Sequence, residues 1–284
     1  MAAAIASALD IRSLDLALPQ QSADSGNPQR TLEFSGVFHG HELTRKDRRL
    51  ISGLAPLDAL LEGGIPRGRI SEVIGAPGSG KTSLAAAFAA SSTSRGEVAA
   101  WLDASGAFDP DSMMAAGVEL KRLLWASFKN TPSSRLPGTM PSRRNSAILK
   151  AAEMILAAGG FGLVIIDFGE DTRPLPQSPA LRLARAAERS GAAVIALAAY
   201  RMCGTFAALS LAAGRAGIRF SRLTPASPAT FEGLSIEATV ARNKMGAMGR
   251  RTRLDALVDP IAADPLTPIV APRAASTSNL RRSS

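Results

Sequence analysis

The stretch Gly75–Ser83 reads GAPGSGKTS, and its glycines, lysine and threonine fit the spacing G-x-x-x-x-G-K-[ST]. The residues before it, 69–74, include the apolar Ile70, Val73 and Ile74, and the residues after it, 81–92, are rich in helix-forming alanine. Glycine allows the backbone to approach a bound group closely. The pattern therefore predicts a strand, a tight turn and a helix, with the backbone N–H groups of the turn directed at an anion.

This turn predicts a phosphate-binding loop for ATP. The loop residues are Gly75, Ala76, Pro77, Gly78, Ser79, Gly80, Lys81, Thr82 and Ser83. We expect Lys81 to hold the β and γ phosphates and the Thr82 hydroxyl to ligate Mg²⁺. The metal also needs a carboxylate at the end of a neighbouring buried strand, and the apolar run FGLVIID ends in Asp167. We expect Asp167 to hold Mg²⁺ through a water molecule.

Short apolar runs alternate with helix-like segments along the chain. The expected strands are residues 69–74, 98–103, 161–167, 193–199 and 236–241, and the expected helices are residues 81–92, 145–158, 179–189 and 207–217. Such alternation predicts an α/β fold in which helices cover both faces of a mostly parallel sheet. We expect an N-terminal helix and linker over residues 1–49, an ATP-binding core over 50–258 and a disordered basic tail over 259–284.

The composition limits the classes of function. The net charge of +9 and the pI near 10.7 favour a polyanionic partner such as nucleic acid, although a solvated basic surface is an equal alternative. Cys203 is the only cysteine, which excludes an intramolecular disulfide and fits a reducing cytosol. No apolar run approaches the roughly 18 to 20 residues that cross a bilayer, so we expect a cytoplasmic, nucleoid-associated protein without a membrane partner.

Several stretches of this core resemble the bacterial RecA recombinases. They are ISGLAPLDALLEGGIPRGRISEVIGAPGSGKTS (51–83), WLDASGAFDP (101–110), AAGVEL (115–120), AYRM (199–202) and RNK (242–244). The resemblance implies the RecA-like P-loop NTPase fold over about residues 50–250. It also implies that Asp109 contacts the adenine, and that Arg242 and Lys244 reach the nucleotide of a neighbouring subunit in a homo-oligomer.

The departures from this family concern catalysis and DNA binding. Ser105 stands where RecA proteins carry the catalytic glutamate, and Ala199 stands where they carry a glutamine that senses the γ-phosphate. Only 31 residues separate Asp167 from Ala199, so both DNA-binding loops of the family look shortened. A RecA-like core with these losses resembles the ImuA type, the RecA paralogues that accompany error-prone translesion polymerases.

We therefore expect an ATP-binding accessory protein of DNA repair and SOS damage tolerance, with weak or no ATP hydrolysis. It would bind single-stranded DNA without sequence preference through Arg201, Arg250 and Arg251, and would bind translesion polymerase proteins or RecA. One alternative is a DNA-dependent ATPase recombinase in which Glu170 or Asp171 replaces the lost glutamate. The other is a P-loop scaffold unrelated to DNA.

Overall fold

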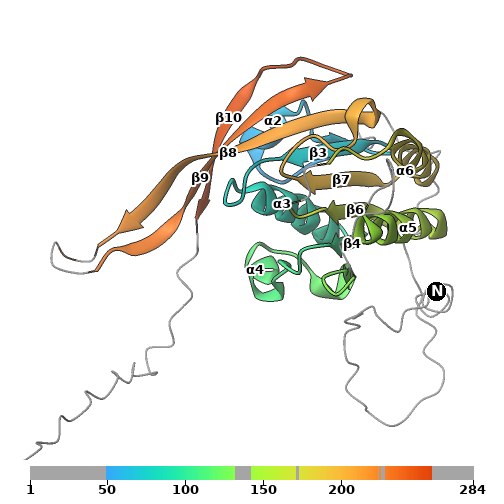
Figure 1. The fold of residues 1–284 in the computed structure, drawn as a ribbon. Coiled ribbons are helices and arrows are strands. Elements are labelled where there is room, and N and C mark those ends of the chain that lie inside the picture. The colour runs from blue at the N-terminus through green and yellow to red at the C-terminus, as the bar shows by residue number, and fades with distance from the viewer. Residues whose placement is uncertain (1–48, 132–141, 171–172, 223, 225–227, 258–284) are drawn as a thin grey trace, which may run out of the picture.

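An eight-stranded sheet dominates the part of the chain that this computed structural model describes, residues 49–131, 142–170, 173–222, 224 and 228–257 (Figure 1). The strand order is β10-β9-β8-β3-β7-β6-β4-β5. The strands are β3 (Ile70–Ile74), β4 (Val98–Asp103), β5 (Leu123–Ser127), β6 (Phe161–Asp167), β7 (Ala193–Ala198), β8 (Ala207–Ser221), β9 (Thr230–Asn243) and β10 (Arg251–Leu257). A separate two-stranded sheet pairs β1 (Arg49–Leu50) with β2 (Ile65–Pro66).

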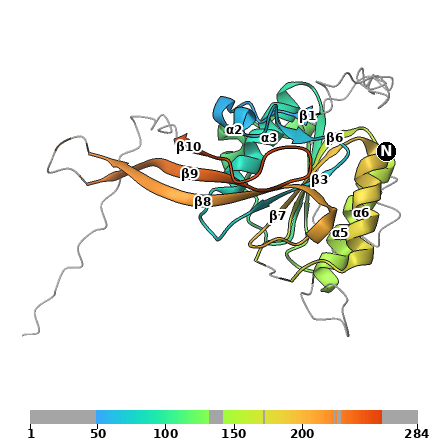
Figure 2. The same cartoon turned by 90° about the horizontal axis from the view of Figure 1, so that it is seen from above.

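The helices pack on both faces of the large sheet (Figure 2). They are α2 (Ala55–Leu60), α3 (Lys81–Ser94), α4 (Pro110–Ala115), α5 (Arg143–Ala158) and α6 (Gln177–Ser190), with short 3-10 turns η1 (Leu120–Arg122) and η2 (Gly204–Phe206). One apolar core joins α2, α3 and α4 to the sheet, and a second core joins α5 and α6 to the opposite face. None of the helices that the structure describes has the length and apolar character of a membrane span.

Strand β3 lies in the middle of the sheet and carries the phosphate-loop sequence at its end. It pairs in parallel with β7 on one side and with β8 on the other. Every residue of β7 is buried, as expected of a parallel strand with helices on both faces. The predicted α/β fold with a mostly parallel sheet is therefore confirmed, and the antiparallel pairs lie at one side, between β8, β9 and β10.

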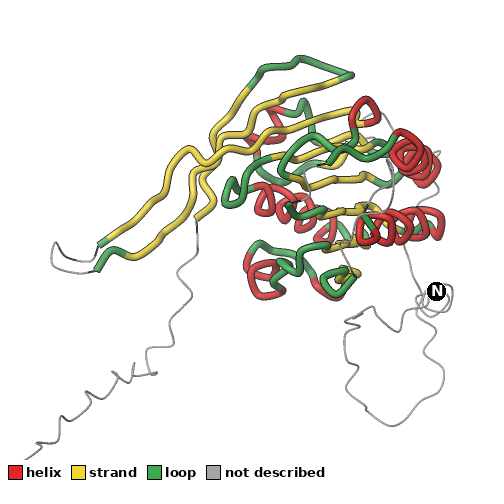
Figure 3. The backbone as a smooth tube through the Cα atoms, viewed as in Figure 1, coloured by secondary structure: helices red, strands yellow, loops and turns green. Residues whose placement is uncertain are grey.

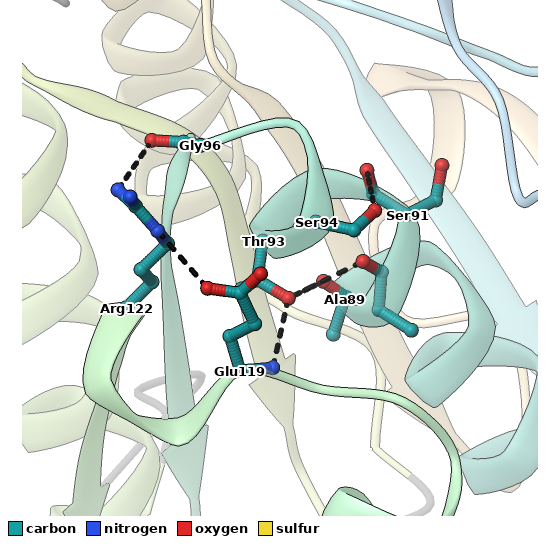
Figure 4. A network of polar contacts seen from close by, with 8 residues as sticks. Ala89, Ser91, Thr93, Ser94, Gly96, Glu119 and Arg122 are labelled. Atoms are coloured by element: carbon teal, nitrogen blue, oxygen red, sulfur yellow. Dashed lines mark hydrogen bonds and ion pairs between the residues drawn. The ribbon is translucent and has the colours of Figure 1, made fainter.

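The C-terminal end of α3 is fixed to the connection that leads into β5 (Figure 4). The Thr93 hydroxyl donates to the Ala89 carbonyl at 2.8 Å and accepts from the Glu119 backbone N–H at 3.1 Å. The Arg122 guanidinium pairs with the Glu119 carboxylate and donates to the Gly96 carbonyl. Because these bonds hold the far end of α3, the direction of its first turn relative to the sheet is also constrained.

The expected helix over residues 207–217 is wrong, because these residues form most of strand β8 (Figure 3). The sequence AALSLAAGRAG has the alanine content of a helix. Ala207 and Leu209 are nevertheless buried between β3 and β9, where only an extended chain can pair with both neighbours. Tertiary packing therefore overrides the local helix propensity here.

Strands β8 and β9 continue as a hairpin well beyond the rest of the sheet (Figures 1 and 2). Near its free end the rings of Phe220 and Phe231 meet edge to face with centroids 5.9 Å apart. Both rings and the neighbouring Ile218 are exposed. The inner part of the hairpin belongs to the core instead, since Ile236 and Val240 of β9 are buried against the face that α3 covers.

Candidate nucleotide-binding site

The phosphate-loop sequence forms the turn between β3 and α3, as its residue types predict. Gly75 cannot be replaced without a clash, because a Cβ there would lie 2.4 Å from the Ser79 Oγ and 2.5 Å from the Ala213 carbonyl oxygen. Gly80 has φ of +87°, and a Cβ there would lie 2.3 Å from the Cδ1 of Ile236. The glycines thus allow the loop to fold tightly against β8 and β9.

The first turn of α3 has the properties of an anion site. Helix α3 begins at Lys81, its N-cap is Gly80, and no side chain caps its N-terminal N–H groups. The first four N–H groups of any helix lack intrahelical partners, and the helix dipole adds partial positive charge there. Within the part of the chain that the structure describes, the buried Ser79 Oγ also lacks a hydrogen-bond partner. These groups fit a phosphate group, and Gly78 on the outer side of the loop has open space beside it.

Asp167 ends β6, two strands away from β3, and is buried. Burial raises the pKa of its carboxyl from the ordinary 3.8 to about 6; the Gly169 N–H bond and Lys81 lower it, while the negative charges of Asp103 and Glu170 raise it. The influence of Lys81 places the lysine and the carboxylate in one electrostatic environment. Such a carboxylate fits a hard cation, and Mg²⁺ usually takes its other ligands from water and phosphate.

Asp103, at the end of β4, pairs in register with Asp167 and has a different task. Its carboxylate accepts backbone N–H bonds from Ser105, Gly106 and Phe108 at 2.8 to 3.0 Å. The Ser105 hydroxyl donates to the same carboxylate at 3.0 Å. Asp103 therefore fixes the connection after β4. Ser105 has a hydroxyl that already donates to the Asp103 carboxylate, and it has no carboxylate that could act as a base.

Two further sequence candidates, Asp109 and Glu170, are exposed. Asp109 is exposed and caps α4, where hydrogen bonds from the Ser112 side chain and backbone lower the pKa of its carboxyl. Glu170 is exposed just beyond Asp167, while Asp171 lies outside the described residues. Their assignments to adenine contact and to catalysis stay predictions.

Three of the five basic residues predicted to bind DNA or the nucleotide of a neighbouring subunit lie close together. Arg201 and Arg242 both donate to the Gly204 carbonyl, at 3.4 and 2.8 Å, and Lys244 bonds the Thr205 carbonyl. These three cations therefore gather around η2, which follows β7. We refer to Arg201, Arg242 and Lys244 as the η2 cluster.

The other predicted DNA contacts are not in this cluster. Arg250 pairs with Glu62 at 3.2 Å and lies beside the end of α2. Arg251 is exposed at the start of β10. The structure thus brings together Arg201 with the two residues predicted to reach a neighbouring nucleotide, and it does not bring Arg201 together with Arg250.

One residue of the site region, Glu72, was missed from the sequence. It is buried in the middle of β3, three residues before the loop, and its carboxylate accepts bonds from the segment that follows β7. The available signal was a carboxylate in the centre of RISEVI, the expected strand that leads into the loop. Lys, Glu, Arg and Asp are almost never fully buried unless they are paired.

The fold and the loop define a P-loop NTPase of the RecA type. Residues 40–168 match the model of the RecA N-terminal domain. The RecA protein of Picosynechococcus sp. is 35% identical over 116 residues, which cover 41% of this chain and 29% of that protein. The RecA protein of Saccharopolyspora erythraea is 33% identical over 158 residues, which cover 55% of this chain and 40% of that protein.

Among solved structures, the RadB recombinase matches with a TM-score of 0.50 and 17% identity, over 72% of this chain and 94% of the RadB chain. This likeness supports the fold. The sequence matches cover well under half the length of the RecA proteins named above. Together with the match over residues 40–168, these similarities relate this part of the chain to the RecA family.

Proposed function

We propose that this chain is an ATP-binding accessory protein of DNA repair and SOS damage tolerance that hydrolyses ATP slowly or not at all. The observation that carries the proposal is the arrangement of the loop: an uncapped helix N-terminus with Lys81 follows β3, at the same edge of the parallel sheet where β6 ends in the buried Asp167. Similarity to the RecA family over residues 40–168 favours a role in repair or recombination.

In this proposal the loop residues 75–83 hold the phosphates, and Lys81 is the cation on the β and γ phosphates. The Thr82 hydroxyl and, through water, Asp167 hold Mg²⁺, which neutralises phosphate charge when bound. Asp109 contacts the adenine. Ser105 is the reason for slow turnover, since a hydroxyl cannot act as a carboxylate base near neutral pH.

The proposed partner surface is the η2 cluster. Its three cations, in a chain of net charge +9, favour binding to the phosphates of single-stranded DNA without base recognition. In a homo-oligomer, Arg242 and Lys244 of one copy would instead reach the nucleotide of the next, and Arg201 alone of the cluster would contact DNA. A translesion polymerase protein or RecA is the proposed protein partner, in the cytoplasm and near the nucleoid.

Binding of a fluorescent ATP analogue with Mg²⁺ tests this function. Lys81→Ala should weaken binding by about 100-fold, because a charge-assisted contact to phosphate is worth about 2 to 3 kcal/mol. Lys121→Ala, an exposed lysine in η1, is the matched control and should bind as the wild type does. Equal binding by wild type and Lys81→Ala would refute the nucleotide site.

The second candidate function is a DNA-dependent ATPase recombinase, which the names of the RecA and RadB relatives favour. Here Glu170, exposed beside Asp167, would be the base. Hydrolysis stimulated by single-stranded DNA and abolished by Glu170→Gln would support it over the accessory role. A chain that binds nucleotide but no DNA at low ionic strength would instead be a scaffold unrelated to DNA.

A further inference from the structure

The carboxylate of Glu72 holds the chain that follows β7. Glu72 is 1% exposed, and its neighbours across the sheet are Ala196 of β7 and Ser210 of β8. One carboxylate oxygen accepts the backbone N–H groups of Met202 at 2.7 Å and Cys203 at 2.6 Å. The other accepts from the Ser210 hydroxyl at 2.8 Å, so both oxygens are bonded.

Arg201, in the same segment, places a positive charge beside the Glu72 carboxylate. The Arg201 Nε lies 3.8 Å from the Glu72 carboxylate, while the Arg201 side chain is 44% exposed toward solvent. A buried carboxylate is costly unless it is paired and hydrogen-bonded. Glu72 meets both conditions only if residues 201–203 keep this conformation, so the charge ties these three residues to β3.

The position of Glu72 links this segment to the phosphate loop by a short, rigid path. Two residues of β3, Val73 and Ile74, separate Glu72 from the first glycine of the loop, and the next part of the chain after residues 201–203 is η2, around which the basic cluster gathers. The Met202 carbonyl also accepts the Leu175 N–H at 2.8 Å. Residues 201–203 are therefore held between the strand that carries the phosphate loop and the chain that leads into α6.

We propose that Glu72 is a positioning residue that locks residues 201–203 in one conformation and so holds the η2 cluster in place. This inference rests on the proposed function for its DNA-binding consequence, but the lock itself is a property of the chain alone.

The single cysteine of the chain, Cys203, reports on the lock. Its side chain is buried within the locked segment, and burial together with the Glu72 carboxylate raises the pKa of its thiol. A buried, protonated thiol reacts slowly with a disulfide reagent such as DTNB. Because Glu72 itself raises that pKa, Glu72→Gln changes the reactivity of the thiol as well as the opening of the segment. Hydrogen exchange of the Met202 and Cys203 backbone N–H groups is therefore measured beside labelling without nucleotide or DNA, since exchange reports opening of residues 201–203 and does not depend on the thiol.

Glu72→Gln removes the charge and keeps the shape. We expect DTNB to label Cys203 about 10- to 100-fold faster in this variant, because the opening equilibrium loses charge-assisted hydrogen bonds. Glu97→Gln is the matched control: Glu97 accepts bonds from Arg67 and Ser92 before the start of β4, away from this segment. It should lower the midpoint of urea unfolding while changing labelling under native conditions by less than about threefold.

Two results would overturn the lock. One is exchange of the Met202 and Cys203 N–H groups at the wild-type rate in Glu72→Gln, even if labelling is faster; the other is equal acceleration in Glu97→Gln at matched stability, which would mean that exchange and labelling follow global unfolding. Single-stranded DNA affinity, measured by fluorescence anisotropy, should also be lower in Glu72→Gln than in Glu97→Gln, because the cluster is then no longer held in one arrangement.

Failure of the lock is distinguishable from failure of the proposed function. If the wild type binds no DNA at any salt concentration, the proposed function fails, and the exchange rates still decide the role of Glu72. If DNA binds and Glu72→Gln leaves exchange unchanged, the function stands and the positioning role fails.

Discussion

Replacing Asp167 with asparagine should stabilise the nucleotide-free protein while removing its response to magnesium. Burial raises the pKa of the Asp167 carboxyl from 3.8 to about 6, so the fold favours the protonated form. The stability that this preference provides is present below about pH 3.8 and is lost as the pH rises through about 6. Each pKa unit corresponds to about 1.4 kcal/mol, so the ionised group costs about 3 kcal/mol at neutral pH.

Asparagine keeps a carbonyl oxygen for the Gly169 N–H and cannot ionise. The free energy of unfolding of Asp167→Asn minus that of the wild type should therefore be near zero at about pH 4 and rise to about 3 kcal/mol by about pH 7. Urea unfolding across this range measures the difference. Asp255→Asn is the control, since Asp255 is exposed and pairs with Arg219, and its difference should stay below about 1 kcal/mol.

The second half of this prediction concerns the ligand. A bound Mg²⁺–nucleotide complex should raise the melting temperature of the wild type, because a ligand that binds only the folded state stabilises it. In Asp167→Asn the part of that increase that depends on Mg²⁺ should disappear. The reasoning would be refuted by a stability difference that is independent of pH, or by a variant less stable than the wild type at neutral pH.

Two other variants test the packing. Gly75→Ala should cost about 1 to 3 kcal/mol in urea unfolding, because the added Cβ would meet the Ala213 carbonyl oxygen at 2.5 Å, whereas Gly214→Ala meets no such contact; equal costs would contradict this account. Arg67→Met should cost about 2 to 3 kcal/mol, since it leaves the mostly buried Glu97 without its cation. The double variant Arg67→Met/Glu97→Leu should recover most of that loss, and a double variant no more stable than the single one would rule out the explanation.

Much of the fold was predictable from the sequence, because the central strands and helix α3 follow from local sequence patterns. The apolar runs at 98–103 and 161–167 end in aspartates, and β4 and β6 have these bounds. Helix α3 begins at the lysine of the loop, as the motif requires. Strand β8 was not predictable in this way, because its alanines favour a helix and only pairing with β3 and β9 makes the segment extended.

The loop and Asp167 were predictable because each combines a characteristic residue type with a position at the end of an expected strand. The loop and Asp167 come from strands whose carboxyl ends meet at one edge of a parallel sheet, so a sequence pattern suffices to place them together. The contacts of Glu72 with residues 202 and 203 and of Arg250 with Glu62 join positions far apart in the chain. No periodicity or motif encodes such pairs, and they required the three-dimensional arrangement.

Ile236 of β9 packs against Gly80, the N-cap residue of α3. The packing of the phosphate loop therefore depends on the number of residues in β9. Successive residues of a strand point to opposite faces, so inserting or deleting one residue within the part of β9 that pairs with β8 would turn the Ile236 side chain away and leave the first turn of α3 without its apolar neighbour. Changes in the connection between Ser221 and Thr230 would leave that alternation intact. Natural variation in hairpin length should therefore accumulate at its free end, while the inner half of β9 keeps a constant residue count.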